Sequence, residues 1–217
     1  MNPALIELII LAGIAVFLFL RLRSVLGTRE GFEKPRMQPK NDAPKRDFKV
    51  IDGGEDKDIT DNVEKNSKSA KALKNIKEKD ETFTVNEFLS GARSAYEWIL
   101  MSFEKNEIDD IRELLSEEVA EAFDSVVEQR ISQGLTIEAE FIGVREMKLV
   151  DASYNSKTKT AEIAVSFIGE MTSVVKNSSG EIVEGDSKQI KRQKDTWTFS
   201  KDILSDNPNW ILVATGE

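Results

Sequence analysis

The spacing of apolar residues changes along the chain, and each change marks a different kind of segment. Apolar residues run from Ala4 to Leu20 with one charge, Glu7, among them. Residues 21–81 show no periodic apolar pattern. From residue 82 onward the apolar positions first follow helical spacing, and after Gly134 they alternate as in β-strands. We therefore predict three segments: residues 1–23, 24–81 and 82–217.

The first segment has the features of a retained transmembrane helix. At about 1.5 Å per residue, residues 4–20 span roughly 26 Å, just enough for a hydrocarbon core of about 30 Å. A cleaved signal peptide is disfavoured because no basic residue precedes the run, Arg21 and Arg23 follow it, and no small-residue cleavage site is present. A buried core helix is disfavoured because the run is apolar on every side. The predicted anchor residues are Leu5, Ile9, Ile14, Phe17, Leu20, Arg21 and Arg23.

Basic residues predict the orientation of this anchor. Arg21, Arg23 and Arg29 follow the span, whereas only Glu7 and the amino terminus lie at its other end. The positive-inside rule then places the C-terminal domain in the cytoplasm. No Arg-rich transit peptide precedes the span, which favours a single-pass protein of the bacterial inner (plasma) membrane.

Residues 24–81 are expected to be a charged, disordered linker. Prolines and glycines interrupt the segment, and its charges fall in alternating basic and acidic blocks. One interpretation is a solvated spacer; the other is that the basic blocks contact anionic lipid. Its aspartates, Asp52, Asp56, Asp58 and Asp61, only faintly resemble a calcium-binding loop, since the required glycine and distal glutamate are missing. We interpret them as part of an acidic linker.

Helix signals open the C-terminal segment. Thr84 and Glu87 form a capping box, with Phe83 and Phe88 at the flanking staple positions. Helical spacing then continues to about Lys105. Two further helices are predicted at about residues 108–115 and 119–131, and Gly134 is the expected stop of the last.

Strand signals follow these helices. Four strands are predicted: one ending near Tyr154, one beginning near Ala161, and two at 187–200 and 210–215, with turns at 155–159 and 177–180. Gly143 and Gly169 are candidate bulges, while Trp197, Phe199 and Trp210 are expected in the sheet core. Helices followed by antiparallel strands indicate an α+β fold with helices packed on a curved sheet.

The amino-acid composition excludes several classes of catalytic and metal-binding site. The chain has no cysteine and no histidine, so thiolate metal sites, disulfides and histidine-based catalysis are excluded. Its net charge of −9 argues against nucleic acid as a partner. The adjacent carboxylates at 109–110 and 117–118 point in different helical directions and do not predict a shared acid–base site. We predict no catalytic, metal or cofactor site, no cofactor and no enzymatic activity.

Four motifs resemble the Tim44-like domain family. They are FLSGARSAYEWIL at 88–100, EGD at 184–186, DTWTFSKD at 195–202 and NPNWILVAT at 207–215. The resemblance implies a cone-shaped fold of the nuclear-transport-factor-two or cystatin type and a noncatalytic role at the inner membrane. The anchor and linker look like those of bacterial adaptor members. The chaperone-recruiting region of the mitochondrial member has no match here.

Three functions remain open. The first is a membrane-tethered adaptor that binds still unknown proteins in membrane-protein transport, assembly or quality control. The second is a small-ligand-binding or enzymatic domain that uses a pocket in the cone, and the third is a structural subunit of a secretion apparatus. Trp98 and Met101 lie off the apolar stripe of their helix; they either form an exposed patch, the candidate partner contact, or pack under the following loop. The acidic residues around 104–124, including Glu104, form a candidate surface for cationic partners.

Overall fold

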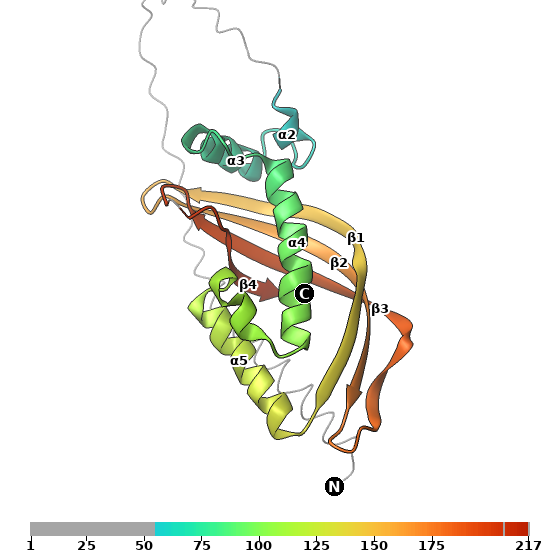
Figure 1. The fold of residues 1–217 in the computed structure, drawn as a ribbon. Coiled ribbons are helices and arrows are strands. Elements are labelled where there is room, and N and C mark those ends of the chain that lie inside the picture. The colour runs from blue at the N-terminus through green and yellow to red at the C-terminus, as the bar shows by residue number, and fades with distance from the viewer. Residues whose placement is uncertain (1–54, 206, 217) are drawn as a thin grey trace, which may run out of the picture. The chain divides into compact units, whose positions relative to one another are not determined.

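The computed structural model describes residues 55–205 and 207–216. The predicted anchor and residues 24–54 of the predicted linker lie outside these described residues. Within the described residues, no helix combines the length and apolar character needed to cross a membrane. The helices are α2 (Lys57–Thr60), α3 (Lys68–Lys79), α4 (Val85–Glu104), the 3-10 helix η1 (Ile108–Leu114) and α5 (Glu117–Ser132) (Figure 1).

Helix α4 begins where the capping box predicts. The Thr84 hydroxyl accepts a hydrogen bond from the Glu87 backbone N–H at 3.2 Å and donates one to the Glu87 carboxylate at 3.0 Å. The Phe83 and Phe88 rings meet with centroids 6.3 Å apart, as a hydrophobic staple requires. Helix α5 likewise ends before Gly134, which has a φ of +65°.

Helix α3 lies within residues 24–81, where the charge pattern predicts a linker. Ser67 caps its first turn, and its Ala72, Leu73 and Ile76 are buried against the rest of the domain. Lysines at every third position made the segment look uniformly polar, although apolar residues one turn apart share a single face. The folded part of the chain therefore begins well before residue 82.

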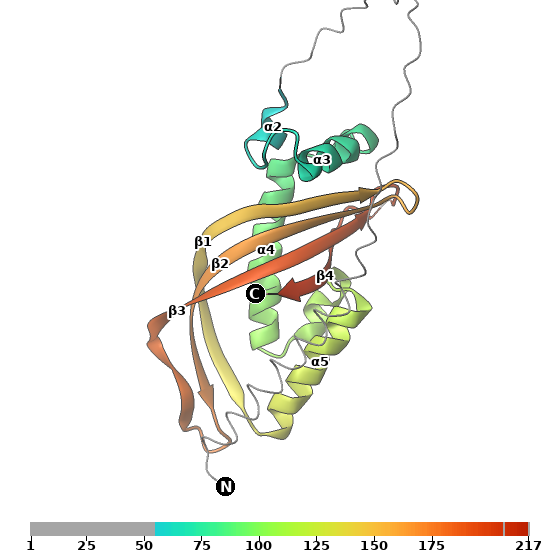
Figure 2. The ribbon, with the colours of Figure 1, turned by 180° about the vertical axis from the view of Figure 1, so that it is seen from behind.

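The strands form one antiparallel sheet in the order in which they occur along the chain. They are β1 (Thr136–Asn155), β2 (Thr160–Lys176), β3 (Ile182–Asp202) and β4 (Ile211–Gly216), in the order β1-β2-β3-β4. The predicted α+β class and both predicted turns are confirmed, while β3 begins five residues earlier than expected. The sheet is curved and open, with α4 on the inner side of the bend and α5 beside β4 (Figures 1 and 2).

Extra residues in the outer strand mark where the sheet bends. The pairing of β1 with β2 shifts at Ile142, Arg145 and Val150. Each shift inserts a residue on β1 and increases the local twist. The predicted bulge at Gly143 is next to the first of these residues. Gly169 on β2 pairs with Val144 and carries no inserted residue, so its role is different.

Gly169 leaves room for Tyr96 of α4. A Cβ atom at Gly169 would lie 2.6 Å from the Tyr96 hydroxyl oxygen. The Tyr96 ring stacks on Phe167 with centroids 4.4 Å apart, and its hydroxyl donates to the Asp195 carboxylate at 2.6 Å. Burial, reinforced by Asp195, raises the pKa of Tyr96 far above its ordinary value, so it stays a donor. This contact joins the middle of α4 to strands β2 and β3.

Two helices also reach the free edge of β1. The Ser69 hydroxyl of α3 accepts a hydrogen bond from the Ala152 backbone N–H at 3.2 Å and donates to the Asp151 carboxylate at 2.7 Å. The Arg93 guanidinium of α4 donates to the Val144 carbonyl at 3.2 Å. Backbone groups of the outer strand thus find side-chain partners where no further strand pairs with them.

Candidate partner-binding groove

An open groove of about 400 Å³ runs between the first half of α4 and the segment that leads into β4. The α4 side carries Phe88 and three small residues, and the other side carries aromatic and apolar residues. The apolar lining comprises Phe83, Phe88, Gly91, Ala92, Ala95, Leu114, Phe199, Pro208 and Trp210. We call this feature the groove.

Aromatic rings form one wall of the groove. The Phe88 ring lies 4.8 Å from Trp210 and 6.0 Å from Phe199, between centroids, and Phe83 lies 5.8 Å from Trp210. Phe83, Phe88 and Phe199 are buried, while Trp210 is half-buried. Such a wall offers a preformed apolar surface for a partner side chain.

Small residues keep the groove open on the α4 side. At Gly91, nothing lies within 4 Å of the position that a Cβ would take. Ala95 follows one turn later on the same side of the helix and also lines the groove. A larger residue at either position would project into the space that the aromatic wall faces.

One ion pair lies at the rim. The Lys201 ammonium is 3.6 Å from the Asp80 carboxylate, and both side chains are mostly buried. The Thr82 hydroxyl and backbone N–H, at 2.6 and 3.0 Å, together with Lys201 hold the pKa of Asp80 below its ordinary value, although partial burial opposes this. Asp80 is therefore ionised at neutral pH, and Lys201 has a charged partner.

The candidate contact residues continue the face of α4 that lines the groove. Trp98 is 52% exposed and lies two turns beyond Gly91, while Met101 is half-buried one turn further on. Tryptophan is enriched at the energetically important positions of protein–protein interfaces. The predicted anchor residues fall outside the described residues and have no place in this site.

A sequence profile of the Tim44-like domain matches residues 69–217, well over half of the chain. The chain belongs to the Tim44-like domain family. The resemblance of the four motifs is thereby confirmed. No curated protein matches the sequence. Among solved structures, the chain is similar to the intermembrane space region of chloroplast protein ARC6, with 9% identity and a TM-score of 0.42, over 59% of this chain and 94% of that one.

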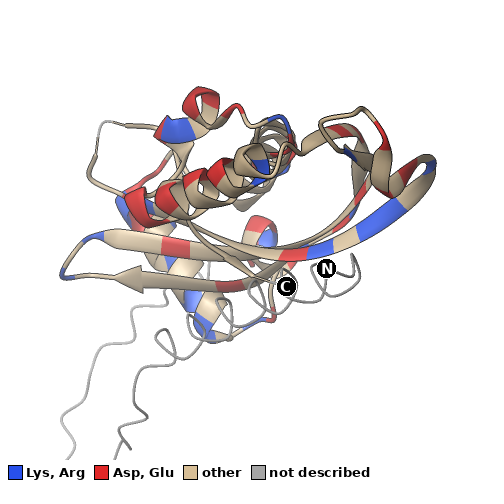
Figure 3. Cartoon of the chain, turned by 90° about the horizontal axis from the view of Figure 1, so that it is seen from below, with Lys and Arg blue, Asp and Glu red and all other residues tan. Residues whose placement is uncertain are grey.

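The acidic surface of this Tim44-like domain differs from the prediction at one residue. Exposed carboxylates follow η1 and α5, and Figure 3 shows acidic residues recurring along the helices. Glu104, however, is only 15% exposed and lies 3.8 Å from the Arg130 guanidinium. Burial raises the pKa of Glu104, although Arg130 opposes the shift. Assigning Glu104 to the solvated surface was wrong, because it packs between α4 and α5.

Arg130 explains why a carboxylate is tolerated there. Its guanidinium lies 4.3 Å from the centre of the Phe103 ring and donates to the Phe103 carbonyl at 3.0 Å. The Phe103 and Phe123 rings meet at 4.5 Å, so these side chains connect the end of α4 to α5. Arg112 similarly pairs with Asp124 at 3.0 Å and Asp109 at 3.3 Å, which reduces the free negative charge there.

The sequence patterns of the Tim44-like domain did not predict the groove. Trp197 and Phe199 are buried as predicted, but Trp210 is half-buried and forms part of the groove wall. The available signal was the spacing of Gly91 and Ala95, which places two small residues one turn apart beside an apolar stripe. Across the described parts of the chain, no cluster of acidic residues could hold a metal ion.

Proposed function

We propose that this Tim44-like protein is a noncatalytic adaptor, tethered to the bacterial inner membrane, that binds other proteins at its cytoplasmic face. The observation that carries the proposal is the aromatic groove, whose helical wall continues to the exposed Trp98. Membership of the Tim44-like family supports the same class of function. The processes that such an adaptor would serve are membrane-protein transport, assembly or quality control.

The groove suits a partner with an apolar anchor side chain. Burial of a large side chain against Phe88 and Trp210 would provide most of the binding energy, because interface energy concentrates in a few buried anchors. Exposed carboxylates on η1 and α5 would speed the approach of a cationic partner through their field. Tethering by residues 4–20 would raise the local concentration of domain and partner, so modest affinity would suffice.

The groove can be filled without disturbing the fold. A side chain added at Gly91 meets no atom within 4 Å, and leucine is a better helix former than glycine. We expect Gly91→Leu to fold normally and to abolish partner crosslinking in cells. Ser90→Leu is the matched control, since Ser90 is exposed on α4 and does not line the groove.

The Trp98–Met101 surface is tested by a second pair of variants. Replacing both Trp98 and Met101 with alanine should weaken the captured complexes, while Ile131→Ala, which truncates an exposed apolar residue on α5, should not. Equal capture by Gly91→Leu and the wild type would refute the groove as the contact. A small molecule that copurifies stoichiometrically, without any protein partner, would instead favour the ligand-binding alternative.

Orientation in the membrane separates the adaptor from a subunit of a secretion apparatus. A reporter that is active only outside the cytoplasm, fused after Glu217, should be silent if Arg21, Arg23 and Arg29 orient the anchor as proposed. A strong signal would favour the secretion alternative.

A further inference from the structure

Residues 55–63 precede the region that matches the Tim44-like family and yet pack on the folded domain. They contain helix α2 and are called the strap below. Ile59 of the strap is 5% exposed, and Val63 packs against the core. The Asp56 carboxylate accepts a hydrogen bond from the Asp58 backbone N–H at 3.1 Å and so begins the short helix.

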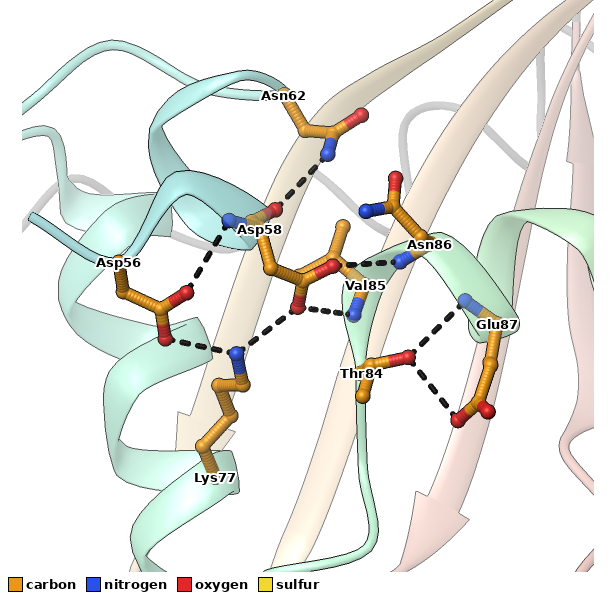
Figure 4. A network of polar contacts seen from close by, with 8 residues as sticks. All are labelled: Asp56, Asp58, Asn62, Lys77, Thr84, Val85, Asn86 and Glu87. Atoms are coloured by element: carbon orange, nitrogen blue, oxygen red, sulfur yellow. Dashed lines mark hydrogen bonds and ion pairs between the residues drawn. The ribbon is translucent and has the colours of Figure 1, made fainter.

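A single carboxylate joins the strap to both neighbouring helices (Figure 4). Asp58 accepts hydrogen bonds from the backbone N–H groups of Val85 at 2.7 Å and Asn86 at 3.0 Å, in the first turn of α4. The Lys77 ammonium of α3 lies 2.9 Å from Asp58 and 2.7 Å from Asp56. The strap, α3 and α4 are thus linked by one compact set of charged hydrogen bonds.

Asp58 completes a cap that α4 cannot make alone. The first N–H groups of a helix have no partner within it. Thr84 satisfies only the N–H of Glu87, whereas those of Val85 and Asn86 point to Asp58. A carboxylate at this end is also favoured by the helix dipole. Removing Asp58 therefore leaves two backbone donors of α4 without their partner.

The turn that Asp58 caps also forms one end of the groove. Thr84, Glu87 and Phe88 line the groove, and Phe88 contacts Trp210 on the far side. The order of this turn therefore affects the shape of the aromatic wall.

The strap is held by its contacts and not by its own helix. Four residues are too few for a helix that is stable in isolation. Ile59 is the one buried residue of the strap and is still 5% exposed, whereas Leu73 and Ile76 of α3 are completely buried. Segments with few buried contacts open at lower free energy than the core. The strap can therefore detach while the sheet stays folded.

We propose that the strap is a conformational switch that couples the N-terminal part of the chain to the groove. When docked, it holds the first turn of α4 and the aromatic wall in place; when detached, it loosens both. Glu55 is the first described residue and begins the strap, so the strap is the part of the domain to which the preceding chain is covalently joined. The effect on partner binding rests on the proposed function, whereas the opening of the strap does not.

Amide hydrogen exchange of the full-length chain in mild detergent tests the opening. Asparagine can still accept hydrogen bonds but carries no charge for Lys77 or the helix dipole. We therefore expect Asp58→Asn to speed exchange at Val85 and Asn86 by roughly two- to thirtyfold. Amides of Val165 and Phe167 in β2 should be unchanged. Asp61→Asn is the matched control, since it neutralises an exposed carboxylate of the same strap. Ile59→Ala should give the same local pattern by a different route.

Quenching of tryptophan fluorescence by acrylamide tests the coupling to the groove. In a Trp98→Phe background, the remaining tryptophans are the buried Trp197 and the half-buried Trp210, so quenching reports on Trp210. Adding Asp58→Asn should increase this quenching, and adding Asp61→Asn should not.

Each outcome decides the proposal. Unchanged exchange at Val85 and Asn86 would overturn the opening, and unchanged quenching of Trp210 would overturn the coupling. Exchange that rises equally in α4 and β2 would show that the strap is an inseparable part of the fold. Absence of any partner crosslink in the wild type would refute the proposed function without affecting these measurements.

Discussion

Helix α4 is fixed at its middle and at its start by different physical means. At the middle, Tyr96 is enclosed by Phe167 and Trp197 and hydrogen-bonds the buried Asp195. At the start, Asp58 and Lys77 hold it through charged hydrogen bonds near the surface. The first contact depends on buried apolar area, and the second on ionisation and on two backbone donors.

The contact at the middle of α4 therefore mainly affects the stability of the whole domain, and the contact at the start mainly affects the order of the first turn. Burial of large apolar side chains, as at the middle of α4, is the main favourable contribution to folding. The contact at the start adds less, but it acts on the turn that borders the groove. Substitutions at the two places should therefore have different sizes and different pH dependences.

The largest loss is expected at the aromatic centre. Trp197 is 4% exposed, and Trp197→Ala removes its ring from between Tyr96 and Phe199. We expect the free energy of unfolding to fall by about 3–5 kcal/mol, as for other buried aromatic residues. Chemical denaturation measures this. A loss below about 1 kcal/mol would mean that the ring is not part of the core.

A smaller loss is expected when only the hydroxyl of Tyr96 is removed. Tyr96→Phe leaves Asp195, 8% exposed, with Gln193 at 3.0 Å as its remaining side-chain partner. We expect a loss of about 1–3 kcal/mol, the usual cost of leaving a buried polar group unpaired. Because the hydroxyl is also the atom nearest to a Cβ at Gly169, Tyr96→Phe should reduce the cost of Gly169→Ala. Additive effects in a double-mutant cycle would contradict this contact.

The smallest loss is expected at the strap, and it should depend on pH. Burial opposes ionisation of Asp58, but Lys77 and the N–H groups of Val85 and Asn86 outweigh it and lower the pKa of Asp58 below its ordinary 3.8. A carboxyl group whose pKa is lower in the folded state than in the unfolded state stabilises the fold. The effect is complete at pH values above the unfolded-state pKa and is lost at pH values below the folded-state pKa. Because asparagine keeps the accepting oxygen and loses the charge, Asp58→Asn should cost about 0.3–2 kcal/mol at neutral pH.

The pH series provides the control for that assignment. The difference between wild type and Asp58→Asn should shrink as pH falls below about 3.8, whereas the difference for Trp197→Ala should persist wherever the protein stays folded. Urea titrations at several pH values measure both. A constant difference for Asp58→Asn would show that its charge does not hold the strap.

Local patterns in the sequence predicted much of this fold. The capping box at Thr84, the stop at Gly134 and the alternation around Phe167 each depend on neighbours in the chain, so α4, α5 and the strands were placed from them. Helix α3 was missed because its lysines mask a narrow apolar face that ends at Ile76. The segment at 108–114 has apolar spacing, but it folds as a 3-10 helix.

The candidate site was less predictable because its contacts join distant segments. Asp58 and Val85 are 27 residues apart, and Tyr96 and Asp195 are 99 apart. The spacing of apolar residues along the chain does not predict contacts between residues so far apart. In the sequence, Asp58 looks like one more acidic residue of a linker. Helical spacing placed Trp98 off the apolar stripe but left its exposure open, and the groove beside it depends on where Trp210 lies.

The side chains that reach the outer edge of β1 have a consequence for how copies of the protein meet. An unpaired edge strand attracts a strand of another molecule through its free N–H and C=O groups. Here the Ala152 N–H donates a hydrogen bond to the Ser69 hydroxyl, and the Val144 carbonyl accepts one from Arg93. Inserted residues also divide β1 into short regular runs. The edge therefore offers little template for intermolecular sheet growth, so crowding of the chains need not lead to aggregation along this edge.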